Sequence, residues 1–174
     1  MHESNTQTNN PLDPVAEPEP DPIGVDVSIQ HSIEVSEDRI RGICEVILRD
    51  HSWTKGEVSV AVVDDATIHQ INREYLDHDY ETDVLSFVLE KDEQHRFLVG
   101  EVIVSADTAK TVGEDVGVDT LDELLLYMIH GLLHLVGFDD KDPANREKMR
   151  QAERKYTSQF EIQYCCPDDG EGHD

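Results

Sequence analysis

The sequence predicts an α+β fold in which a small, mostly mixed four-stranded sheet packs with about five helices. Two observations carry this prediction. Short runs of β-branched and apolar residues, which favour strands, alternate with longer stretches in which apolar residues recur at helical spacing. One helical stretch, at residues 121–135, is apolar almost all round, which is typical of a central, buried helix.

Strands and helices are expected to alternate in the first half of the chain. Residues 25–29 alternate apolar and polar side chains, and residues 58–63 form a short β-branched run, so both are predicted strands. Ser36 is a suitable N-cap for a helix that ends near Arg49. Asp65 is predicted to cap a second helix directly after the 58–63 strand.

Two more strands are expected in the second half, at residues 84–89 and 99–104, followed by a short helix at residues 106–113 that ends at its glycine. Thr120 and Glu123 have the spacing of a capping box and should begin the central helix.

Asp142 and Pro143 fit the N-cap and first position of a last helix. Its apolar stripe consists of Met149, Ala152, Tyr156 and Phe160. Six basic residues fall in or beside this helix: Lys141, Arg146, Lys148, Arg150, Arg154 and Lys155. They are interleaved with acidic residues, so they form either a mixed, solvated helix face or a surface that contacts phosphate.

We expect one folded domain at residues 24–160 between two acidic segments. Residues 1–23 contain five prolines and no Lys or Arg, which is typical of a disordered arm. Residues 161–174 form an acidic C-terminal tail. The simpler interpretation is that both segments increase solubility and are dispensable, and the alternative is that they bind a partner.

Composition excludes several classes of protein. The formal net charge of −25 argues against binding DNA or RNA by bulk electrostatics, although it does not exclude a local basic groove. The longest apolar stretch is far shorter than a membrane span, and the first thirty residues lack the features of a secretory signal. An odd number of cysteines fits reduced thiols in a cytoplasmic protein; they are Cys44, Cys165 and Cys166.

Two histidines on the predicted central helix are the strongest functional signal. His130 and His134 are four residues apart, so both imidazoles emerge from one face of the helix. Gly137 then ends the helix, and a chain that turns back there brings Asp139 or Asp140 toward the imidazoles. Two histidines and a carboxylate suit a catalytic zinc ion with a fourth position for water. The alternative is a pair of hydrogen-bonded core histidines.

The helix lacks the usual metalloprotease base. In the H-E-x-x-H motif, a glutamate follows the first histidine and acts as general base. Here that position is Gly131, which allows another part of the chain to approach the helix closely. A zincin-like peptidase is therefore the less favoured function.

The run at residues 130–140, HGLLHLVGFDD, resembles the YbeY family of bacterial metal-dependent endoribonucleases. TDVLSF at 82–87, GEVIVS at 100–105, and Asn72 and Tyr75 also agree with the family pattern. The resemblance implies a zincin-like fold whose central helix packs with a four-stranded sheet. It also implies a cytoplasmic, single-strand-specific endoribonuclease that acts in 16S rRNA 3′-end maturation and ribosome quality control. The implied partners are single-stranded RNA, 16S rRNA, small-subunit ribosomal proteins and the Era GTPase, with neither DNA nor a membrane.

The implied metal site differs from the family pattern at its third ligand, which is a histidine in the family and Asp140 here. A carboxylate is a harder ligand than imidazole, so Mn²⁺ or Co²⁺ are alternatives to a single Zn²⁺. The resemblance makes His130, His134 and Asp140 the predicted catalytic metal ligands. Asp139 is expected to hold a ligand histidine in its tautomer, but the sequence does not decide which aspartate binds.

The implied RNA-binding residues differ as well. The family carries a functional arginine where this chain has Leu76. Arg73 lies three residues earlier on the same predicted helix, so it is either the substitute or a solvated surface residue. Asp83 and Ser86 match a family block near the site, so they either contact substrate or serve as turn and strand residues. These departures keep open an alternative function, a ribosome assembly factor that binds RNA or the ribosome with little or no catalysis, although the endoribonuclease is favoured.

Overall fold

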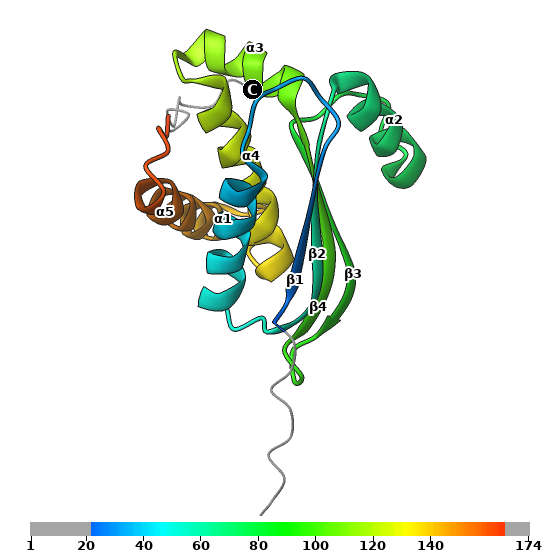
Figure 1. Ribbon diagram of the computed structural model, residues 1–174, viewed down its shortest axis with the longest axis vertical. Helices are drawn as coiled ribbons and strands as arrows, with labels where there is room; N and C mark the ends of the chain where they lie inside the picture. Colours follow the sequence, from blue (N-terminus) through cyan, green and yellow to red (C-terminus); the bar gives the residue numbers. More distant parts are fainter. Residues whose placement is uncertain (1–21, 166–174) are drawn as a thin grey trace, which may run out of the picture.

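One mixed sheet of four strands forms the centre of the computed structural model, which describes residues 22–165 (Figure 1). Strands β1 (Gly24–Ile29), β2 (Lys55–Val63) and β4 (Phe97–Ser105) are parallel, whereas β3 (Val84–Asp92) pairs antiparallel with β4. The order β1-β2-β4-β3 makes β1 and β3 the edge strands. The predicted mixed, four-stranded sheet is confirmed.

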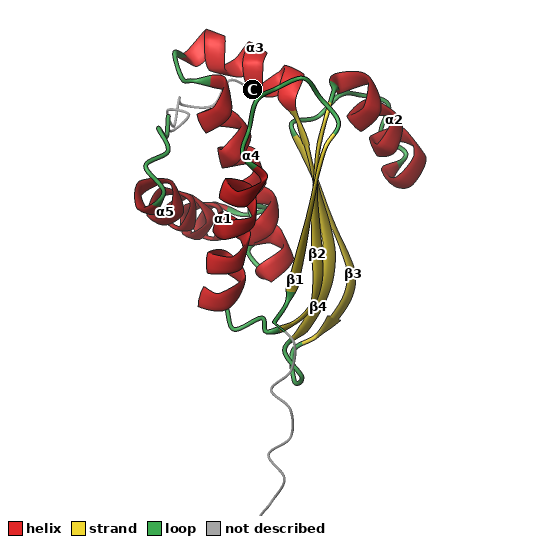
Figure 2. Ribbon diagram, viewed as in Figure 1, coloured by secondary structure: helices red, strands yellow, loops and turns green. Residues whose placement is uncertain are grey.

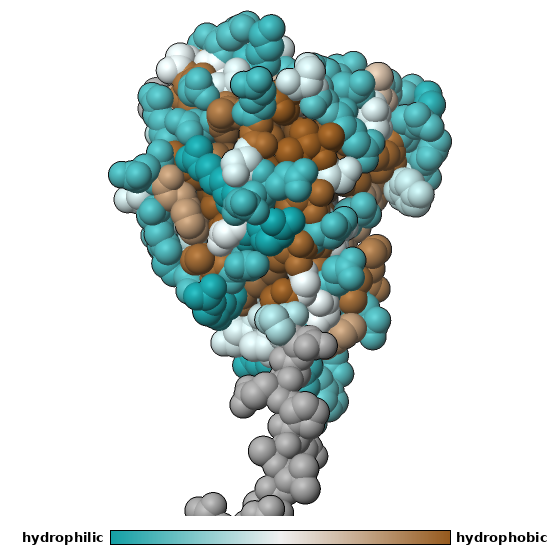
Figure 3. All heavy atoms as spheres, in the orientation of Figure 1, coloured by the Kyte–Doolittle hydropathy of each residue, from teal (hydrophilic) through white to brown (hydrophobic). Residues whose placement is uncertain are grey.

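The helices of the described residues are distributed unequally over the sheet (Figure 2). They are α1 (Glu37–Asp50), α2 (Asp65–Leu76), α3 (Ala106–Val116), α4 (Thr120–Val136) and α5 (Pro143–Gln159). Helices α1 and α4 cover one face of the sheet, α5 packs outside α4, and α2 lies on the opposite face. Polar residues cover much of the face seen in Figure 3, and apolar residues are visible between them. No helix within residues 22–165 is long and apolar enough to cross a membrane.

Strand β2 shows how alternation supplies a core on each face of the sheet. Val58, Val60 and Val62 are buried in the large core with α1 and α4. Val63 points to the other face and joins Ile68 of α2 in a smaller core. The β-branched run that predicted a buried strand therefore packs against helices on both sides.

Helix α4 is central and buried, as its nearly uniform apolar sequence predicts. At Gly131 the helix touches the sheet: a Cβ there would lie 2.7 Å from a methyl carbon of Val102 and 2.9 Å from one of Val84. The Ser86 hydroxyl donates a hydrogen bond of 3.1 Å to the Gly131 carbonyl. The predicted close approach to this glycine is confirmed, and strands β3 and β4 make it.

The beginning of α2 differs from the prediction by one residue. Asp64, and not Asp65, is the N-cap, and its carboxylate accepts a hydrogen bond of 2.8 Å from the Thr67 amide. Asp65 is the first helical residue, and its carboxylate accepts hydrogen bonds from the hydroxyls of Ser105 and Thr108 instead. Contacts between elements thus decide which of two adjacent aspartates caps the helix.

Two other helix ends also differ from the prediction. Helix α3 continues past Gly113 to Gly117, whose φ of 73° is the left-handed conformation that favours glycine. Gly113 is buried within α3, and a Cβ there would lie 2.7 Å from the Val118 carbonyl oxygen. Helix α4 is capped by Asp119, which accepts from the Leu121 amide at 2.9 Å, so Thr120 is the first helical residue and not the cap.

The packed domain extends beyond the predicted boundary at residue 160. Ile162 is 5% exposed and belongs to the large core, and the Tyr164 hydroxyl donates a 2.9 Å hydrogen bond to Glu153. Most of the predicted acidic arm, residues 1–21, and residues 166–174 of the predicted tail lie outside the described residues.

Candidate metal centre

Three side chains converge where α4 ends. The Nε2 atoms of His130 and His134 are 3.0 Å apart. The Oδ2 atom of Asp140 lies 3.6 Å from Nε2 of His130 and 3.8 Å from Nε2 of His134. Within the described residues, this is the group of three whose donor atoms are close enough to share one metal ion. The structure thus brings Asp140 to the two histidines.

The backbone after α4 explains this convergence. Gly137 adopts a φ of 114°, and its amide donates to the His134 carbonyl while the Phe138 amide donates to the Leu133 carbonyl. This left-handed ending reverses the chain. Asp140 follows three residues later and so returns to the face from which the imidazoles emerge.

The spacing of the three donors fits a small tetrahedral cation. Donors held about 2.0–2.2 Å from a tetrahedral zinc ion stand roughly 3.2–3.6 Å apart. The donor distances of 3.0, 3.6 and 3.8 Å are close to these values. One ion between the three side chains would leave its remaining coordination position for water or substrate.

Hydrogen bonds at Nδ1 aim both imidazoles at this point. Nδ1–H of His130 donates to Oε1 of Glu153 at 2.6 Å, and Nδ1–H of His134 donates to the Phe138 carbonyl at 3.1 Å. A proton on Nδ1 leaves Nε2 as the free acceptor that a metal requires. Oε2 of Glu153 in turn accepts the Tyr164 hydroxyl.

Asp139 has a different environment from the one expected for a residue that orients a ligand. Its Oδ1 accepts a hydrogen bond of 2.6 Å from the Lys141 amide in the turn before α5. The orienting contacts come from Glu153 and the Phe138 carbonyl, which the sequence did not single out.

The environment shifts the two imidazoles in opposite directions. Burial alone lowers the pKa of His130, but the hydrogen bond and charge of Glu153, together with Asp140, outweigh burial and raise that pKa. Burial and the neighbouring His130 lower the pKa of His134 below its ordinary value. The carboxylates of Glu153 and Asp140 therefore make His130 the more basic of the two imidazoles.

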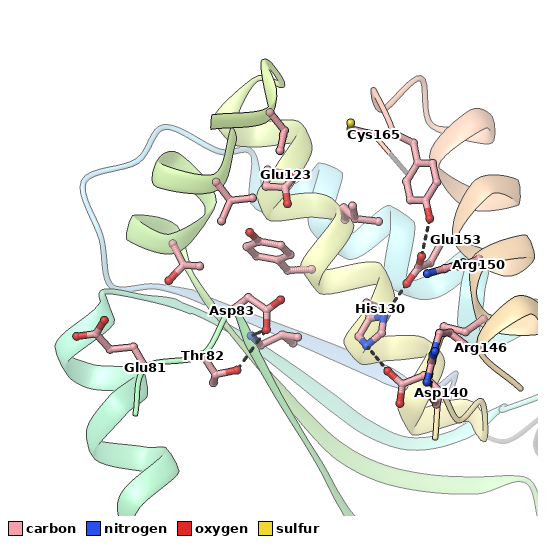
Figure 4. Close-up of a pocket in the computed structure, with 18 residues that line it drawn as sticks. Glu81, Thr82, Asp83, Glu123, His130, Asp140, Arg146, Arg150, Glu153 and Cys165 are labelled. Atoms are coloured by element: carbon pink, nitrogen blue, oxygen red, sulfur yellow. Dashed lines mark hydrogen bonds and ion pairs between the residues drawn. The ribbon is translucent and has the colours of Figure 1, made fainter. Parts of the chain in front are cut away.

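A cavity of about 800 Å³ opens beside these residues (Figure 4). His130 and Asp140 line it together with Glu153, and Asp83 lies across from them. Residues of α3 and α4 supply apolar wall; they are Val112, Val116 and Leu126. The volume is sufficient for a nucleotide-sized group next to His130 and Asp140.

The other predicted substrate residues are not all at the cavity. Asp83 lines it, and its Oδ1 accepts hydrogen bonds from the Thr82 hydroxyl and the Val84 amide. Ser86 lies between β3 and α4, where its bond to Gly131 favours the structural alternative. Arg73 is exposed on α2 and is not among the described residues that line the cavity.

The six basic residues around α5 fall into separate groups. Arg146 and Arg150 line the cavity. Lys155 contacts Asp50 at 3.1 Å, and Arg154 contacts Glu147 at 3.5 Å, which agrees with a mixed, solvated face. The mixed, solvated face therefore describes Arg154 and Lys155, whereas phosphate contact stays a prediction for the residues that line the cavity.

Comparisons with known proteins agree with the sequence motifs. A family model described as Endoribonuclease YbeY matches residues 26–161. The chain is 35% identical over 139 residues to Endoribonuclease YbeY of Salinibacter ruber, an alignment that covers 75% of this chain and 88% of that protein. It is 46% identical over 101 residues to Endoribonuclease YbeY of Rhodopirellula baltica, covering 57% of this chain and about half, 51%, of that longer protein.

A solved structure shares the fold. The solution structure of TM1509 from Thermotoga maritima superposes with a TM-score of 0.58 at 22% sequence identity. The match covers 83% of this chain and 99% of that chain.

Proposed function

This chain belongs to the YbeY family of endoribonucleases, and from that premise we propose that it is a metal-dependent enzyme that cleaves single-stranded RNA in 16S rRNA 3′-end maturation and ribosome quality control. The observation that carries the proposal is the convergence of His130, His134 and Asp140 beside a cavity of about 800 Å³. The three residues are the proposed metal ligands, with Zn²⁺ as the metal and Mn²⁺ or Co²⁺ as alternatives.

A bound ion would supply Lewis acidity and lower the pKa of a coordinated water. Residues of the chain orient the proposed ligands and contact the substrate. Glu153 and the Phe138 carbonyl hold the imidazoles with Nε2 toward the shared point. Asp83, across the cavity, is the proposed acceptor for a substrate hydroxyl or base amino group. We assign Asp139 to the turn that carries Asp140, on the strength of its bond to Lys141.

Ribosomal partners follow from the same proposal. A single-stranded region of 16S rRNA is the proposed substrate, and small-subunit ribosomal proteins and the Era GTPase are the proposed protein partners, in the cytoplasm. Pull-down of ribosomal subunits with the full chain, before and after ribonuclease treatment, distinguishes contacts through RNA from contacts through protein.

Cleavage of a labelled single-stranded RNA tests the activity. The metal-loaded protein is compared with identically purified His134→Ala protein and with protein to which a chelator has been added. We expect cleavage to be lost in both controls, because each removes the ion from the site. Equal cleavage in all three samples would identify a contaminating nuclease and contradict the proposal.

A ribosome assembly factor with little catalysis is the second candidate. Leu76 in place of the family arginine favours it, since that substitution removes a positive charge. Metal binding and ribosome association without RNA cleavage, with association retained by His134→Ala, would select this function.

A further inference from the structure

We propose that Arg146 and Arg150 of α5 bind a phosphodiester group of the RNA beside the metal centre, and so replace the arginine that the family carries at the position of Leu76. This proposal rests on the proposed function, because it assigns the substrate contacts of the same site. It concerns binding, so it is measured separately from cleavage.

Position is the first argument. The two arginines are four residues apart on α5, so their side chains leave the same face of the helix. Both line the cavity that His130 and Asp140 also line. Figure 4 shows Arg146 beside Asp140 and Arg150 beside Glu153. Both arginines therefore line the same cavity as two of the three proposed metal ligands, His130 and Asp140.

The Arg146 side chain contacts the loop that carries Asp140. Its Nε donates a hydrogen bond of 3.4 Å to the main-chain carbonyl of Asp140. A guanidinium that uses Nε in this way retains its two terminal NH₂ groups as donors, in the geometry that matches two phosphate oxygens. Arg150 is half-buried one turn further along α5.

Charge is the second argument. The other charged residues in the described lining of the cavity are acidic, apart from the imidazole of His130; they are Glu81, Asp83, Glu123, Asp140 and Glu153. The whole chain carries a formal charge of −25. A polyanion approaches such a protein only where positive charge is concentrated. In this cavity, that charge lies on Arg146, Arg150 and the proposed metal ion.

The neighbouring basic residues do not compete for this role. Arg73, which the sequence offered as the substitute, is on α2, and α2 covers the opposite face of the sheet from α4 and α5. Arg154 contacts Glu147, outside the described lining of the cavity. Arg154→Ala is therefore a matched control on the same helix.

Binding of a fluorescent single-stranded oligoribonucleotide by anisotropy tests the proposal. Wild type, Arg146→Ala, Arg150→Ala and Arg154→Ala are titrated at several salt concentrations in chelator, which stops metal-dependent cleavage, and zinc content is measured separately after loading. We expect each cavity variant to weaken binding about tenfold. We also expect the slope of log affinity against log salt to become shallower by roughly 0.7 per lost contact. Arg154→Ala should stay within about twofold of wild type.

The same measurement can overturn the proposal. Unchanged affinity and salt slope in Arg146→Ala and Arg150→Ala, or absence of RNA binding by wild type, would contradict it. Equal weakening in Arg154→Ala would assign the effect to the general charge of α5, and loss of zinc in Arg146→Ala would assign it to the Asp140 loop; both also contradict it. RNA binding with the expected slopes but without cleavage would support the phosphate contacts and count against the enzymatic proposal alone.

Discussion

Gly131 leaves no room for a side chain between α4 and the sheet. A Cβ would lie 2.7 Å from Val102, 2.9 Å from Val84 and 3.0 Å from the Ser86 hydroxyl. Alanine is the better helix former by about 1 kcal/mol, but overpacking a core costs about 1–3 kcal/mol. We therefore expect Gly131→Ala to lower the free energy of unfolding in urea denaturation. An unchanged or higher value would mean that the strands move away without cost.

Glu153 is expected to control metal affinity through His130. Its carboxylate is 2.6 Å from Nδ1 of that imidazole and 2.9 Å from the Tyr164 hydroxyl. Groups that orient a metal-binding histidine typically contribute 10–100-fold in affinity. We expect Glu153→Gln to weaken zinc binding by roughly this factor in competition with a chelator, and Tyr164→Phe to have a smaller effect.

Glu147→Gln provides the control for this experiment. Glu147 is on the same helix and contacts Arg154 and Gln151, away from the histidines. Its replacement should leave zinc affinity unchanged. Equal affinities in Glu153→Gln and Glu147→Gln would refute the orienting role.

At the scale of elements, Asp107 joins the beginnings of α2 and α3 to the segment after β1. Its carboxylate accepts the Asp65 amide at 3.0 Å and contacts His31 at 3.0 Å. These hydrogen bonds, the one from the Asp65 amide first, lower the pKa of Asp107. The ionised Asp107 carboxylate therefore stabilises the folded state at pH values above its unfolded pKa of about 3.9. This stabilisation is lost as the pH falls through the lower pKa of Asp107 in the folded protein.

Replacement of this carboxylate tests the junction. Because the side chain is partly exposed, we expect Asp107→Asn to cost about 0.5–1 kcal/mol of unfolding free energy at pH 7. The difference from wild type should shrink as pH falls below about 4. A difference that is independent of pH would mean that the charge of Asp107 does not contribute.

Most elements were predictable because local sequence and packing agree in them. Ser36, Asp142 and Pro143 begin their helices as predicted, and Gly137 ends α4. The errors occur where two candidates stand close together, as with Asp64 beside Asp65. There the choice depends on distant partners, which local propensity does not contain.

The site was predictable to the extent that it is local. His130 and His134 share one helix, and Asp140 follows through a recognisable turn. Glu153 lies 23 residues from His130 and reaches it only because α5 packs on α4. The sequence did contain a signal for Glu153. This glutamate lies between Met149 and Tyr156 of the apolar stripe, and a buried carboxylate requires a partner.

At the scale of the whole molecule, net charge should oppose association with RNA. Residues 1–21 contribute five acidic residues and no Lys or Arg. We expect their removal to increase RNA affinity several-fold at low ionic strength, because less negative charge then repels the polyanion. The gain should vanish in about 1 M salt, where the Debye length is only ~3 Å. Equal affinities at low salt would show that this charge lies too far from the RNA to act.

The contact at Gly131 also has an evolutionary consequence. In metalloproteases the position after the first histidine supplies the general base. Here any side chain at that position starts against Val102 and Val84 of the sheet, whereas His130 lines the cavity. A Gly131→Glu substitution would thus destabilise the domain, so it would not be a simple way to supply the general base. Conversion of this domain into a metalloprotease would therefore require changes at Val102 and Val84 of the sheet as well as the new glutamate.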